Sequence, residues 1–276
     1  MIAYNLTRKE IHYRHDAFSA GLRAVGYEVS GGHPVGRPGD VLLIWSRYGS
    51  FHEIATRFES GGGTVLVAEN GYLGPGGISP HAMNPREWYA LGRGAHNDST
   101  AIPHGGPERW NALGIDLKPW RTDGGHILVC PNRSFGMPDR MMPPTWAEKT
   151  AERLRKLTKR EIRVRPHPGN SPAKKPLAED LAGAWACVIW SSSAGVHALV
   201  AGVPVICEAP FWVCKEITLT LDSCGRAIDA AGLFGTQCET VFRKQAMHRL
   251  AWGQWHISEI ESGEALRAVL NIEGKT

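Results

Sequence analysis

The chain has 276 residues and a formal charge of +4 at neutral pH, and 42% of its residues are apolar. This length suits about two domains, and the apolar fraction supports a large core, which argues against a disordered chain. No apolar run approaches the roughly 20 residues that span a bilayer, and the N-terminal segment lacks the layout of a secretory signal. We therefore expect a cytoplasmic protein without a membrane partner.

The cysteines give no sign of a metal site or of a disulfide framework. No two of them form a CxxC pair, and no Cys/His spacing matches the usual zinc-ligand patterns. Free thiols and no bound metal are therefore expected. The six cysteines are Cys130, Cys187, Cys207, Cys214, Cys224 and Cys238.

Strand and helix patterns alternate in the first part of the chain. Apolar runs predict strands at residues 1–6, 40–46 and 64–71. Amphipathic patterns predict helices between them, at residues 15–26 and 50–63. Strands separated by single helices pair in parallel, so this part predicts a doubly wound sheet.

The texture changes from Tyr72 to about Gly125, where Gly, Pro, Asn and His are frequent and aromatic residues are interspersed. Loops of this length inside a compact domain are usually functional. We interpret the segment as a functional loop, with the junction between two domains near Leu117–Gly125.

The second half of the chain restarts the same alternation. Strands are predicted at residues 126–132, 161–168, 186–193 and 203–210, and helices at residues 145–159, 177–184 and 194–202. The whole pattern predicts two Rossmann-like α/β domains with a ligand cleft at the carboxyl ends of their strands. Their expected limits are residues 1–120 and 121–245, followed by C-terminal helices at 246–276 that pack back across the junction.

Three consecutive serines stand where a buried strand gives way to a helix. Residues 187–190 are apolar on both faces, and Ser191, Ser192 and Ser193 occupy the turn that follows. A helix start offers backbone N–H groups to an anion, and serine hydroxyls cap such groups. Capping alone accounts well for one serine, so the three together favour a phosphate site.

The stretch "RPHP" precedes that turn and ends the preceding strand. Prolines on both sides stiffen the backbone around His167. An imidazole held in this way can donate a hydrogen bond to a phosphate oxygen as a leaving group gains charge. Arg165, two residues earlier, is expected to stand beside it.

A basic segment surrounds this motif. Between residues 153 and 175 only Glu161 opposes the cations, which suits a phosphate-bearing partner such as a nucleotide or a nucleic acid. For the helix at 145–159 taken alone, a solvated face is the alternative interpretation. The cations are Arg153, Arg155, Lys156, Lys159, Arg160, Arg163, Arg165, Lys174 and Lys175.

"RPHP" followed by "VIWSSSAGVHALVAGVPVI" resembles the HP and SS motifs of GT-B glycosyltransferases, a group that includes bacterial sialyltransferases and Kdo and capsule-polysaccharide transferases. The resemblance covers residues 127–210. It implies an α/β, GT-B-like fold of two Rossmann-like domains with a cleft between them. It also implies that His167, Ser191, Ser192 and Ser193 contact the phosphate of a nucleotide-sugar donor.

The same resemblance implies a UDP- or CMP-sugar as co-substrate, no permanently bound cofactor, and an inverting reaction without a metal. Many enzymes of the group carry a ribose-binding Glu on the helix after the serine turn. This chain has His197 there, and Glu208, after the next strand, is the alternative contact for the nucleoside.

Glu69-Asn70-Gly71 resembles an acidic-acidic-Gly motif of the sialyltransferase-like group, although Asn stands at the second position. In that group the carboxylate is a general base, which implies that Glu69 deprotonates an acceptor hydroxyl. The alternative is that Glu69 only caps the loop.

The chain as a whole resembles small glycosyltransferase-like proteins of tailed bacteriophages, through "ENGYLG", "WYALGRGAHND" and "HRLAWGQW". That resemblance implies transfer to a hydroxymethylated pyrimidine in phage DNA, within the host cytoplasm, with a flipped base stacked on aromatic side chains. Packing of the loop is the alternative for Trp88 and Tyr89. The acceptor-side candidates are Tyr72, Trp88, Tyr89, His96 and Asn97.

Other functions stay open beside DNA glycosylation. They are transfer to a saccharide or capsule-type glycan, a nucleotide-sugar epimerase or hydrolase, and a non-catalytic nucleotide- or DNA-binding protein. Hydride transfer is disfavoured because no G-x-G-x-x-G follows the first strand. A serine hydrolase is disfavoured because "SSSAG" lacks the G-x-S-x-G elbow.

Overall fold

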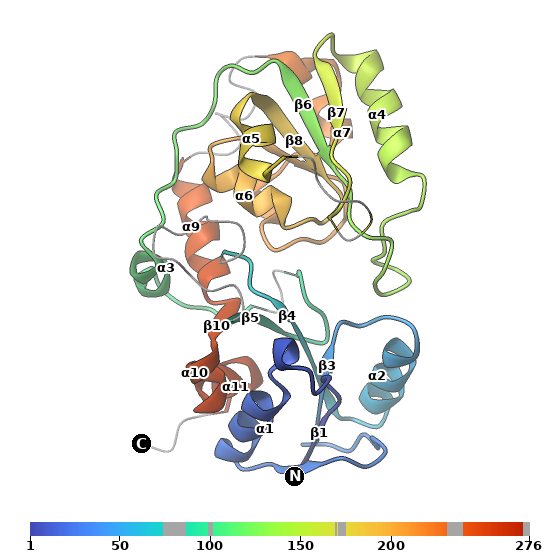
Figure 1. The fold of residues 1–276 in the computed structure, drawn as a ribbon, viewed down its shortest axis with the longest axis vertical. Coiled ribbons are helices and arrows are strands. Elements are labelled where there is room, and N and C mark those ends of the chain that lie inside the picture. Colours follow the sequence, from blue (N-terminus) through green and yellow to red (C-terminus); the bar gives the residue numbers. More distant parts are fainter. Residues whose placement is uncertain (74–86, 99–101, 169, 171–174, 231–239, 273–276) are drawn as a thin grey trace.

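Two β-sheets form two stacked lobes in the computed structural model (Figure 1). The structure describes residues 1–73, 87–98, 102–168, 170, 175–230 and 240–272. The lower sheet has the strand order β10 (Gln254–His256), β5 (Trp88–Arg93), β4 (Thr64–Asn70), β3 (Val41–Trp45), β1 (Ile2–Asn5) and β2 (Glu28–Ser30). The upper sheet has the order β7 (Glu161–Val164), β6 (His126–Cys130), β8 (Ala184–Ile189) and β9 (Val205–Cys207).

The centre of the lower sheet follows the predicted alternation. β1, β3 and β4 are parallel, and the helices between these strands are α1 (His15–Ala24) and α2 (Ser50–Ser60). Residues 41–44 are buried on both faces, as expected of a strand covered on each side. Gly26, with φ of 92°, follows α1 in a conformation that favours glycine.

Three strands of the lower sheet were not predicted. β2 and β10 have three residues each, too short to give a periodic pattern. β5 lies inside the segment that we interpreted as a loop, so that part of the interpretation is wrong. It pairs antiparallel with β4 and with β10, and β10 comes from a part of the chain far away in sequence.

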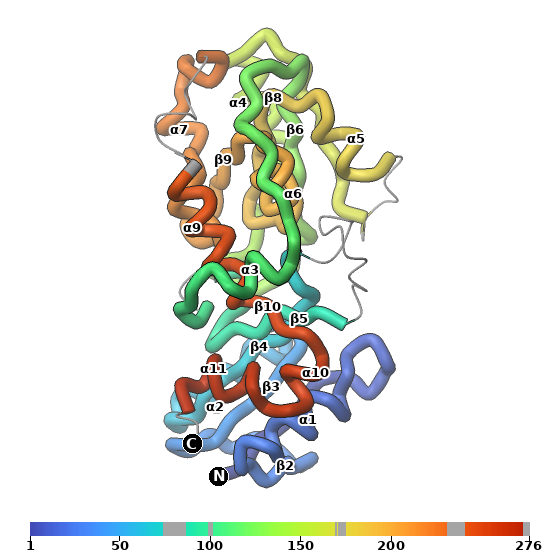
Figure 2. Tube along the Cα trace, turned by 90° about the vertical axis from the view of Figure 1, so that its left-hand side faces the viewer, coloured from blue at the N-terminus to red at the C-terminus, as the bar shows by residue number. Residues whose placement is uncertain are grey.

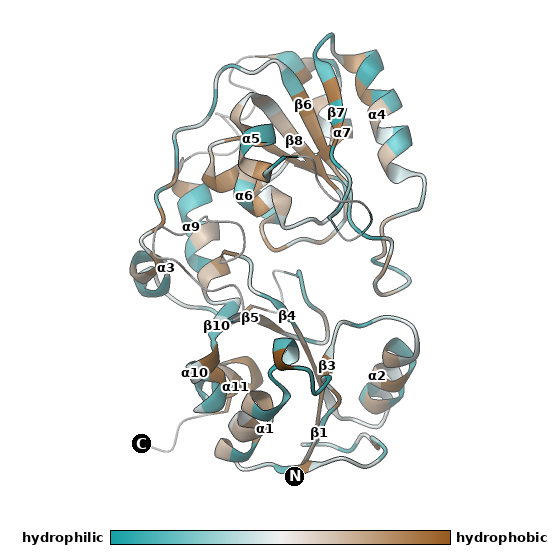
Figure 3. Ribbon diagram, in the orientation of Figure 1, coloured by the Kyte–Doolittle hydropathy of each residue, from teal (hydrophilic) through white to brown (hydrophobic). Residues whose placement is uncertain are grey.

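The upper sheet is parallel throughout, and all six positions of β8 are buried. Its strands are joined through α4 (Trp146–Leu157), α5 (Leu177–Ala182) and α6 (Ala194–Val200). In Figure 3 the strands of this lobe are mostly brown, whereas α4 carries teal segments, as expected of an apolar core beside a solvated helix.

The chain crosses between the lobes twice. It rises after α3 (Glu108–Leu113) and returns through α9 (Thr240–Ala251), as Figure 2 shows. It then forms β10, α10 (Ile257–Glu261) and α11 (Glu264–Leu270), and α10 packs against α1. Gly21 of α1 lies so close to the carbonyl of Ile260 that a side chain there would collide with it. The predicted domain limits stay predictions, but this tail clearly completes the lower lobe.

The described residues also form the short helices η1 (Ile11–Tyr13), η3 (Lys215–Ile217), α7 (Leu221–Cys224) and η4 (Gly225–Asp229). Over the described ranges, no helix is both long and apolar enough to cross a membrane. The five cysteines that the structure describes are buried and free, and Cys238 lies outside the described residues. No group of three His, Cys, Asp or Glu side chains suited to a metal ion occurs in the described part of the chain.

Candidate active site

A cavity of about 370 Å³ lies between the two lobes. Its walls come from the loops that follow β1, β3, β4 and β5 in the lower sheet and β6 and β7 in the upper sheet. For the parallel strands these are the carboxyl ends, where open α/β sheets bind their ligands. The lower lobe contributes Leu6, Arg8, His12, Tyr13, Trp45, Ser46, Arg47, Tyr48, Phe51, Glu69, Asn70 and His96, and the upper lobe Asn132, Arg133, Phe135, Gly136 and His167.

Glu69 reaches this cavity from the end of β4. One carboxylate oxygen accepts a hydrogen bond from the hydroxyl of Ser46 at 3.1 Å, and the other accepts from the backbone N–H of Asn70, also at 3.1 Å. Ser46 has φ of 65°, a left-handed conformation that is uncommon outside glycine and that clusters at functional sites. Among the described ion pairs none involves Glu69. Its carboxylate is therefore oriented but not neutralised, which suits a base.

His167 lines the same cavity from the loop after β7. Burial lowers the pKa of its imidazole, and the charge of Arg133 lowers it further. The ring also lines a smaller neighbouring hollow of about 190 Å³, together with Ser192, Ser193 and Ala194. His167 is thus the wall shared by the two hollows, and the structure brings it together with Glu69 on one side and the serine turn on the other.

The three serines have different surroundings. Ser191 is buried, and its backbone N–H donates to the side-chain oxygen of Asn132 at 3.0 Å. The hydroxyl of Ser192 accepts the N–H of Ala194 at 3.2 Å, which is the predicted capping interaction. Ser193 is exposed at the start of α6, and its hydroxyl makes no capping bond. Ser192 and Ser193 line the smaller hollow, whereas Ser191 lines neither.

Arg165 does not stand free beside His167. Its guanidinium is paired with the carboxylate of Asp180 and donates to the carbonyl of Lys175 at 2.7 Å. The side chain is only 12% exposed, although it borders the smaller hollow. Its charge is therefore largely compensated within the upper lobe, and its contact with a phosphate stays a prediction.

Three arginines that sequence reasoning missed line the main cavity: Arg8 and Arg47 from the lower lobe, and Arg133 from the loop after β6. Arg133 is the one on the side of His167, and its guanidinium lies 4.8 Å from the ring centroid of Phe135. That ring stacks on Tyr48 of the lower lobe, with centroids 5.6 Å apart. Arg133 and Tyr48 each follow the end of a predicted strand. Their proximity to those strand ends was the sequence signal that could have identified them as site residues.

Of the predicted acceptor-side residues, only His96 lines the cavity. Burial lowers the pKa of its imidazole, the carboxylate of Glu69 opposes this shift, and Arg140 adds to it. Asn97 instead contacts the serine turn, where its side-chain amide donates to the carbonyl of Ser191.

The other acceptor-side candidates have packed surroundings, which for Trp88 and Tyr89 was the alternative interpretation. Tyr72 is buried, burial raises the pKa of its phenol, and its oxygen accepts the backbone N–H of Asn97 at 3.0 Å. Tyr89 has no exposed surface, and its hydroxyl donates to the carbonyl of His12 at 3.0 Å. Trp88 packs edge-on against His256 of β10. None of the three lines the cavity. Tyr89 belongs to the core of the lower lobe, whereas Trp88, its neighbour on β5, packs against the core cluster that contains Tyr72 and Ala90.

The two nucleoside candidates also line neither hollow. Glu208 accepts the backbone N–H of Leu221 at 2.8 Å and lies 4.0 Å from the guanidinium of Arg153. Burial lowers the pKa of His197 to about 4, so this ring is neutral at pH 7. Both residues serve the packing of the upper lobe in this conformation.

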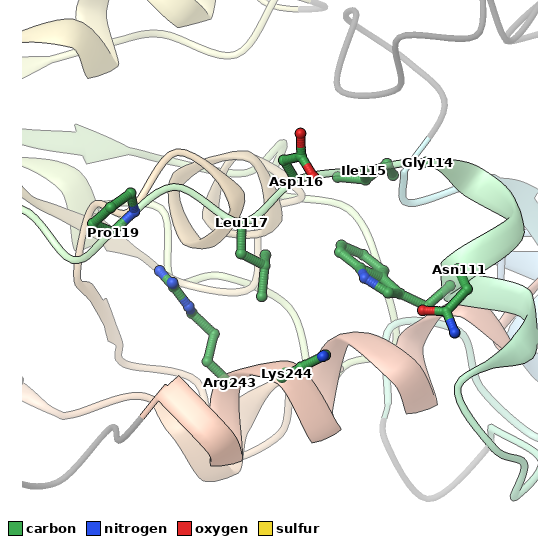
Figure 4. Close-up of a pocket in the computed structure, with 9 residues that line it drawn as sticks. Asn111, Gly114, Ile115, Asp116, Leu117, Pro119, Arg243 and Lys244 are labelled. Atoms are coloured by element: carbon green, nitrogen blue, oxygen red, sulfur yellow. The ribbon is translucent and has the colours of Figure 1, made fainter.

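A third hollow, of about 660 Å³, lies where the chain crosses between the lobes. Figure 4 shows Arg243 and Lys244 of α9 facing the segment around Leu117 and Pro119. The guanidinium of Arg243 lies 4.0 Å from the ring centroid of Trp120 and donates to the carbonyl of Lys118 at 2.8 Å. These contacts fasten the crossing segment to α9, and none of the predicted site residues is present.

No protein-family model and no curated protein matches this chain. Two solved structures from Thermosulfurimonas dismutans are similar to it. The KpsC beta Kdo 2,7 transferase has a TM-score of 0.58 over 99% of this chain and 100% of its own, with 14% sequence identity. The KpsC beta Kdo 2,4 transferase has a TM-score of 0.53 over 92% of each chain, with 15% identity. The chain therefore has the α/β, GT-B-like fold that was predicted.

Proposed function

We propose that this protein is a nucleotide-sugar-dependent glycosyltransferase. The observation that carries the proposal is that Glu69 from the lower lobe and His167 from the upper lobe line one cavity. A candidate base and a candidate phosphate ligand thus face the same space from opposite sides. The fold shared with two structures named as Kdo transferases supports the same activity class.

On the donor side, the phosphate of a UDP- or CMP-sugar would lie at His167. Because this ring separates the two hollows, the phosphate can meet Ser192 and Ser193 on one side while the sugar extends into the main cavity. Arg133 supplies positive charge to the leaving phosphate, so we propose a reaction that needs no metal. α6 has seven residues and a correspondingly small dipole, which makes these side chains the main phosphate ligands.

On the acceptor side, Glu69 would take the proton of the attacking hydroxyl. The freed oxygen forms the new bond to the anomeric carbon as the bond from that carbon to the phosphate oxygen breaks. The electron pair leaves on the nucleotide phosphate, and the proton stays on Glu69. Attack opposite to the leaving group inverts the anomeric centre.

A saccharide is the acceptor that we propose first. The two similar structures are named as beta Kdo 2,7 and beta Kdo 2,4 transferases. A further hollow of about 720 Å³ shares Leu6 and Phe51 with the cavity, which leaves room for an acceptor longer than one sugar unit. Serine, threonine and asparagine side chains in that hollow suit saccharide hydroxyls.

A hydroxymethylated pyrimidine in DNA is the second candidate. It is favoured by the aromatic rings that line the cavity, since a flipped base stacks on such rings. They belong to Tyr13, Trp45, Tyr48, Phe51 and Phe135 rather than to the predicted Trp88 and Tyr89.

The test begins with the donor. Thermal unfolding with UDP-, CMP- and GDP-sugars should show stabilisation by one of them, and this stabilisation should be lost in His167→Ala. With that donor, an oligosaccharide mixture and hydroxymethylcytosine-containing DNA are then offered as acceptors, and product masses are measured. A mass increase in one acceptor identifies its class. A bound donor without any product would instead favour a non-catalytic nucleotide-binding protein.

A further inference from the structure

Three consecutive residues after β5 reach three different places. His96 lines the cavity. Asn97 donates through its side-chain amide to the carbonyl of Ser191 in the upper lobe. Asp98 forms an ion pair with Arg140, also in the upper lobe. We call residues 96–98 the bridge.

The contact made by Asn97 is built from both sides. Its φ is 61°, and its backbone N–H donates to the phenol oxygen of the buried Tyr72 at 3.0 Å. Across the gap, the N–H of Ser191 is held by Asn132, which itself lines the cavity. A polar chain therefore runs from Tyr72 through Asn97 and Ser191 to Asn132.

Asp98 makes the second contact, one residue further along. Its side chain is 10% exposed and that of Arg140 is 28% exposed, so the pair is shielded from water. The carbonyl of Arg140 accepts the indole N–H of Trp190 at 3.0 Å. Trp190 immediately precedes Ser191, so both contacts of the bridge act on the same strand end.

We propose that Asn97 and Asp98 are positioning residues that couple the serine turn of the upper lobe to His96 and Glu69 in the lower lobe. This inference rests on the proposed function, in which the turn holds the donor and Glu69 activates the acceptor. Domains within one chain move relative to each other unless their interface is large and apolar. Misplacement of reacting groups by about 1 Å costs on the order of a hundredfold in rate, so a fixed contact beside the cavity has a direct effect on transfer.

The test is Asn97→Gly, because glycine adopts the left-handed conformation without strain and removes only the amide. We expect kcat to fall about tenfold, since a buried carbonyl loses its partner and the lobes lose a contact. The dissociation constants of UDP and CMP should stay within about twofold, because Asn132 still holds the turn. If Asn97 only stabilised the fold, the folded variant would keep both the kcat and the dissociation constants of the wild type.

The chain offers a matched control in Asn271→Gly. Asn271 also has a left-handed φ, of 54°, and ends α11 in the lower lobe. The substitution carries the same backbone cost but touches no contact between the lobes, so kcat should stay at the wild-type value. Asn97→Asp should be worse than Asn97→Gly, because a carboxylate cannot donate to the Ser191 carbonyl and repels it.

Amide hydrogen exchange provides a readout without turnover. In the protein without ligand, Asn97→Gly should speed exchange in residues 191–197 relative to wild type, and Asn271→Gly should not. Unchanged exchange there overturns the coupling even if no substrate is found. Wild-type kcat in Asn97→Gly overturns it as well, as does an equal loss of kcat and nucleotide affinity. Failure of every donor to bind the wild type would count against the proposed function instead.

Discussion

Two cationic regions of the upper lobe differ in what surrounds them. The segment 153–165 is dense in Arg and Lys, yet four of its five arginines are paired with carboxylates that lie mostly elsewhere in the chain. The loop after β6 carries Arg133, which lines the cavity beside His167, and Arg140, which is paired with Asp98. The pairs in the first region are Arg153 with Asp222, Arg160 with Asp229, Arg163 with Glu161, and Arg165 with Asp180.

The difference shows why a run of like charges in a sequence is a poor guide to a binding surface. Asp222 and Asp229 are about 70 residues away in sequence from Arg153 and Arg160, and only the folded chain brings them together. Exposed pairs of this kind add little to stability, but they do reduce the field that a phosphate would meet. A single arginine at the carboxyl end of a strand is better placed to bind an anion.

The largest expected effect comes from the carboxylate opposite Arg133. Glu69→Gln should lower transfer by about 10²–10⁴-fold, because the amide cannot accept the proton of the acceptor hydroxyl. Donor binding should not change, since Glu69 lies on the lower lobe. Initial rates and the dissociation constant of the nucleotide-sugar measure both. Glu53→Gln, on the exposed face of α2, is the control. Turnover that survives in Glu69→Gln would end its assignment as the base.

The next effect compares the two cationic regions directly. Arg133→Gln should weaken nucleotide-sugar binding by roughly ten- to a hundredfold, the loss expected for a charge-assisted contact to phosphate. Arg163→Gln removes the same charge from an arginine paired with Glu161 and should leave affinity unchanged. Titration calorimetry with the donor measures both variants. Equal losses in the two would mean that the whole basic surface acts on the donor.

Arg165 separates the two roles that an arginine near His167 can have. Arg165→Gln leaves the carboxylate of Asp180, which is 20% exposed, without its cation, so the free energy of unfolding should fall by about 1–3 kcal/mol. Donor affinity, measured below the unfolding temperature, should stay near wild type. A variant as stable as wild type that no longer binds the donor would restore the phosphate contact predicted from the sequence.

A smaller effect concerns pH. Burial and Arg133 lower the pKa of His167 below its ordinary value of 6.5, so the free protein holds a neutral imidazole at pH 7. A bound phosphate favours the protonated ring, so affinity should rise severalfold as pH falls from 7 through 6. His167→Gln should abolish this rise, whereas Arg133→Gln should move it to higher pH. A pH-independent affinity in wild type would mean that His167 does not meet the phosphate.

The sequence predicted which strand ends form the site better than it predicted which side chains line it. Periodicity located β4 and β7, whose carboxyl ends face the space between the sheets, and Glu69 and His167 at these ends line one cavity. Tyr89 was misassigned because β5 pairs with a strand more than 160 residues later, and local patterning does not reveal that partner. Arg133 and Tyr48 were missed because the inward turn of a loop side chain depends on tertiary contacts.

The smallest expected effect is in the basic segment itself. Arg155 and Lys156 are exposed on α4, and no residue of that helix lines the cavity. The double substitution to Gln should change transfer to a saccharide little, and stability by no more than about 0.5 kcal/mol. Duplex DNA affinity as a function of salt provides the sharper measurement. Loss of two phosphate contacts would reduce the slope of log K against log salt by about two. A slope reduced in this way would identify α4 as a DNA-binding face and would favour a DNA acceptor. An unchanged slope would leave the cavity as the phosphate-binding region of this lobe.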